Sequence, residues 1–267
     1  MNGRLESQQF LGEDSGKFLV GVTAGIVGLS GGGSHVVQQL AHAGIGGFVP
    51  VDFDIVEEKN LNRLVGATAE DARLKRSKTD VAVRVIRGVN PMARLTPRRA
   101  TWQESTAALR RCDVIFGCVD SYRERDELEH FCRRFLIPYI DLGMDVHTAA
   151  GGFSVSGQTV LSSPGGPCLR CLGILTDRRL AEEAGRYGDA GSRPQVVWVN
   201  GVLASLGVGL FVQLVCPWDG APQTTACCEF DGNRHRVETN RMDHAGDLRC
   251  THYRDDELGD MFFTRGG

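Results

Sequence analysis

A short apolar run, a cluster of glycines, a helix-like segment and a second apolar run follow one another in "IVGLSGGGSHVVQQLAHAGIGGFVPVDFD", from Ile26 to Asp54. A strand, glycines and a helix start in this order place backbone N–H groups against a phosphate. Glycine lets the backbone approach such a ligand closely, and Asp52, at the end of the second strand, suits ribose hydroxyls. The segment therefore predicts a nucleotide-binding βαβ unit. Glycines that only let a helix pack on a strand would give the same short pattern.

Short apolar runs alternate with helix-like segments through the first half of the chain. Strand-like runs lie at 24–29, 46–54, 94–102, 113–120 and 137–143, and helix-like patterns lie at 34–43, 79–87 and 121–135. Repeated βα units of this length imply a parallel sheet with helices on both faces. After Gly143, "AGGFSVSGQTV" at 150–160 resembles an antiparallel pair, and "TACCEFDGNRHRVE" at 225–238 resembles a hairpin that turns at Asp231–Gly232.

The fold class that these patterns predict is α/β. We expect a Rossmann-like, doubly wound and mostly parallel sheet with an antiparallel C-terminal extension. A chain of 267 residues, 42% of them hydrophobic, can bury a full core. Because no linker long enough to separate two domains is visible, we expect a single domain over residues 1–267, with a nucleotide-binding core at about 20–145 and a second half at about 146–267.

Charge and hydropathy narrow the range of partners. The net charge of -3 and the isoelectric point near 6.2 predict no general attraction to nucleic acid or to an anionic membrane. One segment, Val196–Val215, carries no charge over about the length that spans a bilayer. Its polar Asn200, Ser205 and Gln213 and its lack of a basic flank favour a helix buried in the core or in a dimer seam. We therefore expect no membrane partner.

The cysteines indicate a reducing compartment. The first 18 residues lack the apolar central run of a signal peptide, so we expect the nine cysteines to be reduced in a cytoplasmic protein. Cys168 and Cys171 form a C-x-x-C pair in a loop rich in proline and glycine, which is the spacing of two thiolate ligands of zinc. A pair of ordinary reduced cysteines is the alternative.

Polar and cationic side chains crowd the residues around and after Asp52, in "VDFDIVEEKNLNRLVG" at 51–66. A nicotinamide-dependent dehydrogenase needs an acid for its ribose there and nothing more. The crowding suits a triphosphate that reacts at the carboxyl edge of the sheet. Here the sequence resembles the ThiF/MoeB/E1 family, the ATP-dependent adenylating enzymes that activate ubiquitin-like and sulfur-carrier proteins. The resemblance runs from about Arg4 to His252, and its most specific part is the aspartates followed by "NLNR".

The resemblance implies a role for several residues. It implies that Asp52 binds the ribose and that Asp54 supports the loop or the metal. It implies that Asn60, Arg63 and Lys78 contact the phosphates, with Lys75 as the competing lysine. It also implies that Asp120 binds Mg²⁺ and the reacting groups. The implied nucleotide-binding set is Gly28, Gly31, Gly33, Asp52, Asp54, Asn60, Arg63, Lys78 and Asp120, of which Arg63, Lys78 and Asp120 would act in catalysis. A solvated Arg63 and an Asp120 that caps the helix at Ser121 are the structural alternatives.

For the zinc pair, the resemblance implies partners near the C-terminus, where the family carries a second C-x-x-C. This chain has "RCTHYR" at 249–254, so Cys250 matches and Tyr253 occupies the place of the final cysteine. The implied structural zinc site consists of Cys168, Cys171, Cys250 and His252, with His244 as an alternative fourth ligand. The second half of the chain would then carry the zinc, the crossover loop and the docking site for the carrier.

The function that the resemblance implies is ATP-dependent adenylation of the C-terminal glycine of a ubiquitin-like or sulfur-carrier protein that ends in Gly-Gly, with release of pyrophosphate. A homodimer using ATP, Mg²⁺ and Zn²⁺ would carry it out. The alternatives are adenylation of a small molecule, a peptide or a tRNA base on the same fold, a nicotinamide-dependent oxidoreductase, and an inactive nucleotide-binding adaptor. No cysteine lies between Leu172 and Val215, so we expect no thioester step, as in MoeB.

Two sequence features differ from the family pattern, and a third is shared with the family's substrates. Ser30 stands in the glycine loop where the family usually has glycine. Where the family carries an arginine in an Arg-Gln pair that reaches the nucleotide of the opposite subunit, this chain has Ser7–Gln8, with Arg4 three residues earlier. Either Arg4 replaces that arginine or the contact is missing. The chain ends in Gly266–Gly267, as the family's substrates do, and a polar tail without a role is the simpler interpretation.

Overall fold

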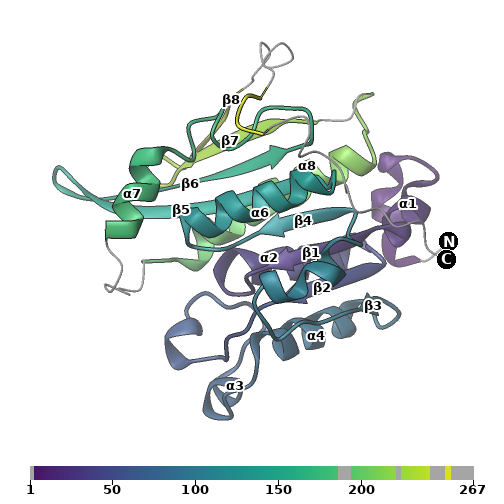
Figure 1. The fold of residues 1–267 in the computed structure, drawn as a ribbon. Helices are drawn as coiled ribbons and strands as arrows, with labels where there is room; N and C mark the ends of the chain where they lie inside the picture. Colours follow the sequence, from purple (N-terminus) through teal and green to yellow (C-terminus); the bar gives the residue numbers. More distant parts are fainter. Residues whose placement is uncertain (1–2, 186–193, 221–223, 241–249, 254–267) are drawn as a thin grey trace.

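A computed structural model describes residues 3–185, 194–220, 224–240 and 250–253 (Figure 1). The strands are β1 (Thr23–Val27), β2 (Gly47–Val51), β3 (Arg94–Leu95), β4 (Val114–Gly117), β5 (Tyr139–Ala149), β6 (Gly152–Ser162), β7 (Ala226–Asp231) and β8 (Arg236–Asn240). The helices are α1 (Ser15–Gly21), α2 (Gly31–Ala43), α3 (Ala69–Arg73), α4 (Lys78–Val89), α5 (Thr106–Leu109), α6 (Tyr122–Arg134), α7 (Asp177–Gly185) and α8 (Val197–Val215). Short 3-10 helices are η1 (Gly3–Leu11), η2 (Glu58–Asn60) and η3 (Gln103–Ser105).

The described strands join in one eight-stranded sheet with the order β3-β2-β1-β4-β5-β6-β7-β8. The strands from β3 to β5 pair in parallel, and those from β5 to β8 pair antiparallel. The predicted α/β fold, a mostly parallel sheet with an antiparallel C-terminal extension, is confirmed. Because β1 lies between β2 and β4, the direction of strand progression reverses at β1, where sheets of this type open a ligand crevice at their carboxyl ends.

Helices cover both faces of the sheet, as the βα repeats predicted. The buried apolar residues of α2 and α8, with Ala82 and Ile86 of α4, belong to one core cluster, and those of α5 and α6 belong to a second. Figure 1 is seen from the side of α6, which crosses in front of β4 and β5. Successive side chains of β4 point to opposite faces of the sheet, so Val114 and Phe116 pack in the first cluster and Ile115 packs in the second.

Two strand predictions were wrong in detail. The run at 94–102 keeps strand pairing only at β3, followed by an isolated bridge between Val51 and Arg98. The N–H groups of Thr96 and Arg98 still donate to the carbonyls of Phe48 and Pro50, so Pro97 between them costs no hydrogen bond to β2. The run at 150–160 is a single long strand, β6, rather than a pair, and its antiparallel neighbours are β5 and β7. The C-terminal hairpin of β7 and β8 is confirmed, with its turn following Asp231.

The long apolar segment forms α8. Among the described residues, it is the one helix long and apolar enough to cross a membrane, and 44% of its most apolar window is buried. It packs against α2 and against β5 and β6, with Leu203, Ala204 and Phe211 fully buried. This contact agrees with the predicted buried helix. The start of α8 lies at the surface, where Trp198 is 55% exposed.

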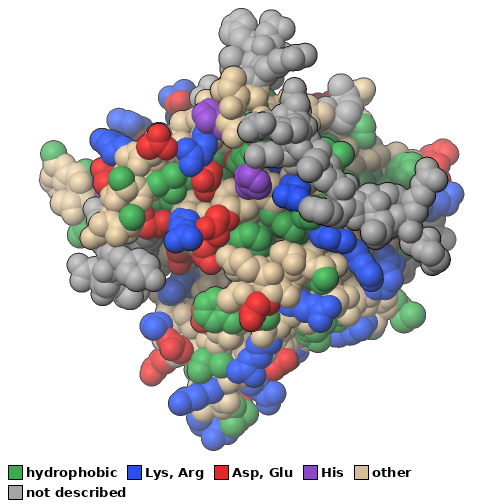
Figure 2. Space-filling view, in the orientation of Figure 1, with side chains coloured by type: hydrophobic (Ala, Val, Ile, Leu, Met, Phe, Trp, Pro, Cys, Tyr) green, Lys and Arg blue, Asp and Glu red, His purple; other side chains and the backbone are tan. Residues whose placement is uncertain are grey.

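Charged side chains of both signs are interspersed on the face drawn in Figure 2. Over this face, Lys and Arg side chains alternate with Asp and Glu rather than gathering into one basic field. A mixed surface of this kind agrees with the small net charge of the sequence.

The glycine loop between β1 and α2 depends on two close backbone contacts. Gly28 has a φ of +84°, and a Cβ there would lie 2.5 Å from the carbonyl oxygen of Cys118. A Cβ at Gly33 would lie 1.8 Å from the carbonyl oxygen of Gly28, because the first turn of α2 folds back onto the loop. Glycine at both positions is therefore a steric requirement of the loop.

We predict that Gly33→Ala lowers the free energy of unfolding by at least about 1–3 kcal/mol, since α2 must move away from the loop. The matched control is Gly32→Ala, where the nearest atom to an added Cβ is 3.5 Å away. The Gly32→Ala variant should leave the free energy of unfolding unchanged or raise it by up to about 1 kcal/mol, because alanine favours a helix. Urea denaturation of both variants measures the difference. Equal stabilities would contradict the contact between Gly28 and Gly33.

Candidate active site and cysteine–histidine cluster

A cavity of about 330 Å³ opens at the carboxyl edge of the sheet. Its walls come from the ends of β1, β2 and β4, from the middle of β5, from the first residues of α2, α4 and α6, and from α8. A pocket of this size is in the range of sites for small molecules. The predicted site residues on its wall are Gly28, Gly31, Asp52, Asp54, Lys78 and Asp120.

The carboxylate of Asp52 fastens the glycine loop to the end of β2. Its Oδ2 accepts a hydrogen bond from the backbone N–H of Leu29 at 2.8 Å, and its Oδ1 accepts one from the N–H of Asp54 at 2.8 Å. Burial raises the pKa of this carboxyl, and Lys78 and the two backbone donors oppose that rise. Asp52 therefore shapes the loop on which a nucleotide would lie, in addition to the predicted ribose contact.

Lys78 is the lysine that the structure brings into the cavity. It lies at the first position of α4, after the N-cap Ser77, and its side chain is only 7% exposed. Its Nζ lies 2.7 Å from Asp54 Oδ2 and 3.9 Å from Asp52 Oδ2. Lys75, the competing lysine, is exposed and does not line the cavity, and its φ is 50°. Lys78, and not Lys75, is therefore the lysine on the cavity wall.

Asn60 and Arg63 lie beside the cavity rather than on its wall. The side-chain oxygen of Asn60 accepts from the N–H of Glu57 at 2.9 Å and closes η2. Arg63 Nη1 donates to the carbonyl of Lys59 and to the side chain of Asn62, both at 2.9 Å. The Nε of Arg63 is buried and has no hydrogen-bond partner among the described residues. The structure therefore places these two residues in a compact loop that adjoins the site.

Asp120 follows β4 and faces the cavity. It does not cap α6, because Ser121 is the N-cap and its Oγ accepts from the N–H of Glu124 at 3.3 Å. The structural alternative for Asp120 is thus removed. Glu124 also lines the cavity; burial raises its pKa, and the carboxylates of Glu127 and Asp120 raise it further. The accumulated negative charge on this wall favours a cation between it and a phosphate.

Polar residues that the sequence did not indicate complete the wall. Gln195 precedes α8 and donates from Nε2 to Asp120 Oδ1 at 2.7 Å. Asn200 on α8 lines the cavity, and the buried Arg125 pairs there with Asp141. The signal for Asn200 was an amide inside an otherwise apolar helix. Gln195 and Arg125 had no signal of spacing or motif, because they come from segments far apart in the sequence.

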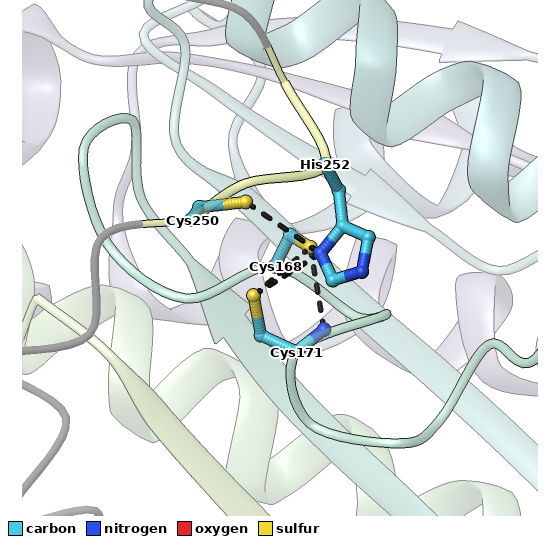
Figure 3. A group of neighbouring side chains, drawn as sticks. All are labelled: Cys168, Cys171, Cys250 and His252. Atoms are coloured by element: carbon cyan, nitrogen blue, oxygen red, sulfur yellow. Dashed lines mark hydrogen bonds between the residues drawn. The ribbon is translucent and has the colours of Figure 1, made fainter.

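The four predicted metal ligands come together in one cluster (Figure 3). The three thiol sulfurs and the imidazole nitrogen lie within 4.8 Å of one another, and they point toward a common centre. His252 Nδ1 lies 3.4 Å from the sulfur of Cys168, 3.3 Å from Cys171 and 3.9 Å from Cys250. The cluster joins two segments that are far apart in the chain.

Tyr253, in the place of the family's final cysteine, is not part of the cluster. It is buried, and its hydroxyl donates to Glu129 Oε2 on α6 at 3.1 Å. The guanidinium of Arg133 lies 5.0 Å from the centre of its ring. Tyr253 therefore anchors the segment that carries Cys250 and His252 to α6.

Other predictions fall at or beyond the limits of the described residues. Ser7 and Gln8 lie in η1, with Ser7 exposed, and the side chain of Arg4 is not among those described. His244 and Gly266–Gly267 lie outside the described residues. Ser30 lines the cavity, and its buried hydroxyl has no hydrogen-bond partner in the described structure.

Comparison with known proteins agrees with this geometry. The chain matches the ThiF family over residues 3–251. It is 34% identical to the SAMP-activating enzyme E1 of Haloferax volcanii over 149 residues, 55% of this chain and 52% of that protein. It is 33% identical to the sulfur carrier protein ThiS adenylyltransferase of Escherichia coli over 185 residues, 68% of each chain. It is 28% identical to the E. coli molybdopterin-synthase adenylyltransferase over 185 residues, 68% of this chain and 69% of that one.

Solved structures show the same fold. A structure of E. coli MccB with succinimide aligns with a TM-score of 0.74 and 19% identity, covering 91% of this chain and 72% of that one. PaaA aligns with a TM-score of 0.65 and 20% identity, covering 90% of this chain and 84% of that one.

The sheet, its glycine loop and the cavity at the strand ends define an α/β protein with a crevice suited to a nucleotide. The chain belongs to the ThiF family. The family predicted from the sequence is therefore confirmed, and the relatives named above are adenylyltransferases and a SAMP-activating enzyme E1.

Proposed function

We propose that this protein uses ATP to adenylate the C-terminal glycine of a ubiquitin-like or sulfur-carrier protein, with release of pyrophosphate. The observation that carries the proposal is one cavity lined by the glycine loop, Asp52, Lys78 and Asp120 in a member of the ThiF family. The names of the relatives support the class of substrate. The first relative is matched over 52% of its length, and the two from E. coli over about two thirds.

The chemistry joins two anions, and the charges on the cavity wall suit this task. The carboxylate of the carrier attacks the α-phosphorus of ATP, and pyrophosphate leaves. No general base is needed, because a C-terminal carboxylate is already ionised at neutral pH. Lys78 would offset the charge of the phosphates, and the N-terminus of α2 would add its backbone donors.

Mg²⁺ fits the donor set of the cavity. Carboxylate oxygens are the ligands that this ion prefers, and the acids on the wall are Asp52, Asp54, Asp120, Glu124 and Asp145. In our proposal Asp120 holds the ion, which would supply positive charge to the triphosphate. Arg63 and Asn60 contact the phosphates after Arg63 leaves its bonds to Lys59 and Asn62.

We expect ATP–pyrophosphate exchange that depends on a carrier ending in Gly-Gly. Asp120→Ala, Arg63→Ala and Lys78→Met should each slow the exchange by about 10²–10³-fold, roughly 3–4 kcal/mol, since each removes one fixed charge from the transition state. The matched control is Lys75→Met, three residues from Lys78 and exposed to solvent. It should exchange at the wild-type rate.

Unchanged exchange in both Asp120→Ala and Arg63→Ala would contradict the assigned site. Exchange with a small molecule, a peptide or tRNA in place of the carrier would change the class of substrate. Binding of NADH with no effect of ATP would instead support an oxidoreductase, and ATP binding without turnover would support an adaptor. Fluorescence titration with each nucleotide separates these outcomes.

Zinc fits the cysteine–histidine cluster. A zinc–sulfur bond of 2.3 Å in tetrahedral geometry places two sulfurs about 3.8 Å apart. In the structure, the sulfurs of Cys168 and Cys171 lie 3.6 Å apart, and the nitrogen of His252 lies at similar distances from the three sulfurs. We propose that Cys168, Cys171, Cys250 and His252 hold a structural Zn²⁺ that ties the C-terminal segment to the loop before α7.

We predict about one zinc per chain by mass spectrometry of the purified protein. Cys171→Ser and His252→Ala should lose most of the metal, and the melting temperature should fall because the two tied segments separate. The control is Cys216→Ser, a buried cysteine at the end of α8 outside the cluster. It should keep the metal. A wild-type protein that is free of zinc and is not stabilised by added zinc would contradict the site.

The proposal includes adenylation without a thioester step. Cys118 lies beside the cavity, but burial raises the pKa of its thiol, and the nearby carboxylates of Asp141 and Asp120 add to the effect. Burial also raises the pKa of Cys112 to about 12. Such thiols are poor nucleophiles at neutral pH. All nine cysteines are free, which supports a cytoplasmic location.

We also propose that the protein, a single adenylation domain over residues 1–267, works as a homodimer. Large apolar side chains at the surface support this: Phe10 is 71% exposed, Phe18 58% and Trp198 55%. Exposed aromatic side chains are enriched where proteins meet. Sedimentation velocity should give twice the chain mass of 29.0 kDa, and a monomer at micromolar concentration would contradict the dimer.

A further inference from the structure

Both segments that carry the cysteine–histidine cluster contact one helix, α6. The loop with Cys168 and Cys171 comes before α7, and the segment with Cys250 and His252 comes after β8. Glu129, in the second half of α6, is the residue that both segments contact. Its side chain is fully buried, and each of its two carboxylate oxygens accepts hydrogen bonds from outside the helix.

Glu129 holds the cysteine loop through Leu169, the residue that follows Cys168. The backbone N–H of Leu169 lies 3.1 Å from both Oε1 and Oε2 of Glu129. Within the same turn, the N–H of Cys171 donates to the sulfur of Cys168 at 3.4 Å. Since Leu169 lies between the two cysteines in the sequence, its bond to Glu129 fixes the backbone from which both thiols extend.

The same carboxylate holds the C-terminal segment through Tyr253, the residue that follows His252. The Tyr253 hydroxyl donates to Glu129 Oε2 at 3.1 Å, across 124 positions of sequence. Its ring packs against His130, also on α6, with 5.4 Å between the ring centres. Tyr253 stands in the place of the family's final cysteine. In this chain, that position therefore anchors the segment, and the neighbouring His252 offers the fourth ligand atom.

Arg133, one turn further along α6, contacts the same two segments. Its Nη1 donates to the carbonyl of Gly166 at 3.0 Å and its Nη2 to that of Pro167 at 2.8 Å, just before Cys168. Its guanidinium also lies 5.0 Å from the centre of the Tyr253 ring. A buried pair of charges such as Arg133 and Glu129 adds little net stability over apolar packing. The contribution of this pair is therefore to the position of the two segments.

We propose that Glu129 and Tyr253 are positioning residues of the metal site: together they hold the cysteine loop and the C-terminal segment where the four ligand atoms meet. This inference rests on the proposed structural Zn²⁺ and is independent of the adenylation. A metal that must itself bring two distant segments together loses part of its binding free energy to ordering them. Contacts outside the ligand shell lower that cost, and loss of such a contact costs about 10–100-fold in metal affinity.

The test measures binding of Zn²⁺ alone to the metal-free protein, by competition with a chromophoric chelator of known affinity. Tyr253→Phe removes only the hydroxyl and should weaken Zn²⁺ binding by about 10–100-fold. Glu129→Gln keeps the size of the side chain but loses its charge and one acceptor. It should weaken binding at least as much, because Glu129 acts on both segments. Thermal unfolding verifies that each metal-free variant is folded, and if Glu129→Gln does not fold, Tyr253→Phe decides.

Tyr139→Phe is the matched control. Tyr139 is also buried, and its hydroxyl also donates to a buried carboxylate, that of Asp141, at 3.0 Å. It lies on β5 and is not part of the cluster. This variant should lose thermal stability to a similar extent as Tyr253→Phe, and it should bind Zn²⁺ as tightly as the wild type. The comparison separates a role in positioning the ligands from a role in the stability of the fold.

Zn²⁺ binding within twofold of wild type in Tyr253→Phe would overturn the inference. So would an equal loss of binding in Tyr139→Phe, which would assign the effect to the stability of the whole fold. A wild-type protein that binds no Zn²⁺ would overturn both the proposed metal site and the positioning role, whereas tight wild-type binding with unchanged variants would overturn the positioning role alone. Pyrophosphate exchange does not enter the measurement, so a failure of the proposed adenylation is distinguished from both.

Discussion

The buried carboxylate of Asp52 is the interaction on which the geometry of the site depends. It accepts the N–H of Leu29 and the N–H of Asp54, and so it joins the turn after β1 to the turn after β2. Burial of this group carries a desolvation cost, which Lys78 and the two backbone donors offset. Because β1 is flanked by β2 on one side and β4 on the other, fixing these turns opens the crevice in which the glycine loop, Lys78 and Asp120 meet.

The sequence predicted those parts of the site that belong to a short, recognisable segment of the chain. The glycine loop, Asp52 and Lys78 each follow the end of a strand or begin a helix, so their place in the fold follows from their place in the chain. Cys168 and Cys171 were visible as a spaced pair for the same reason. Gln195 and Glu183 could not be predicted, because their contacts join α6 to segments 60 or more positions away and follow no fixed spacing.

The errors in the fold have equally local causes. Alternating apolar and polar residues at 150–160 predicted strand structure correctly, but a period of two does not say where one strand ends, and β5 and β6 are each 11 residues long. The run at 94–102 has the side chains of a strand, but it lies at the edge of the sheet, where only Arg94 and Leu95 pair as a strand and Arg98 adds one bridge. Arg63 is a different case. Its place beside the cavity follows from bonds within its own loop, and a sequence motif that describes the ligand-bound state does not predict them.

The second half of the chain is part of the site rather than an appendage to it. A nucleotide could be held by the β1–α2 loop and α4 alone, since Asp52 and Lys78 both lie there. Asp120 accepts a bond from Gln195 just before α8, Glu183 on α7 accepts one from the hydroxyl of Ser121, and Asn200 on α8 packs against Gly31 of the loop. Both the glycine loop and the carboxylate of Asp120 therefore contact residues of the second half. The Cys168–His252 cluster and the bond from Tyr253 to Glu129 hold the C-terminal segment against α6, the same helix whose first turn Glu183 fixes. The second half therefore meets the cavity at two places, at Asp120 before α6 and at Gly31 of the glycine loop.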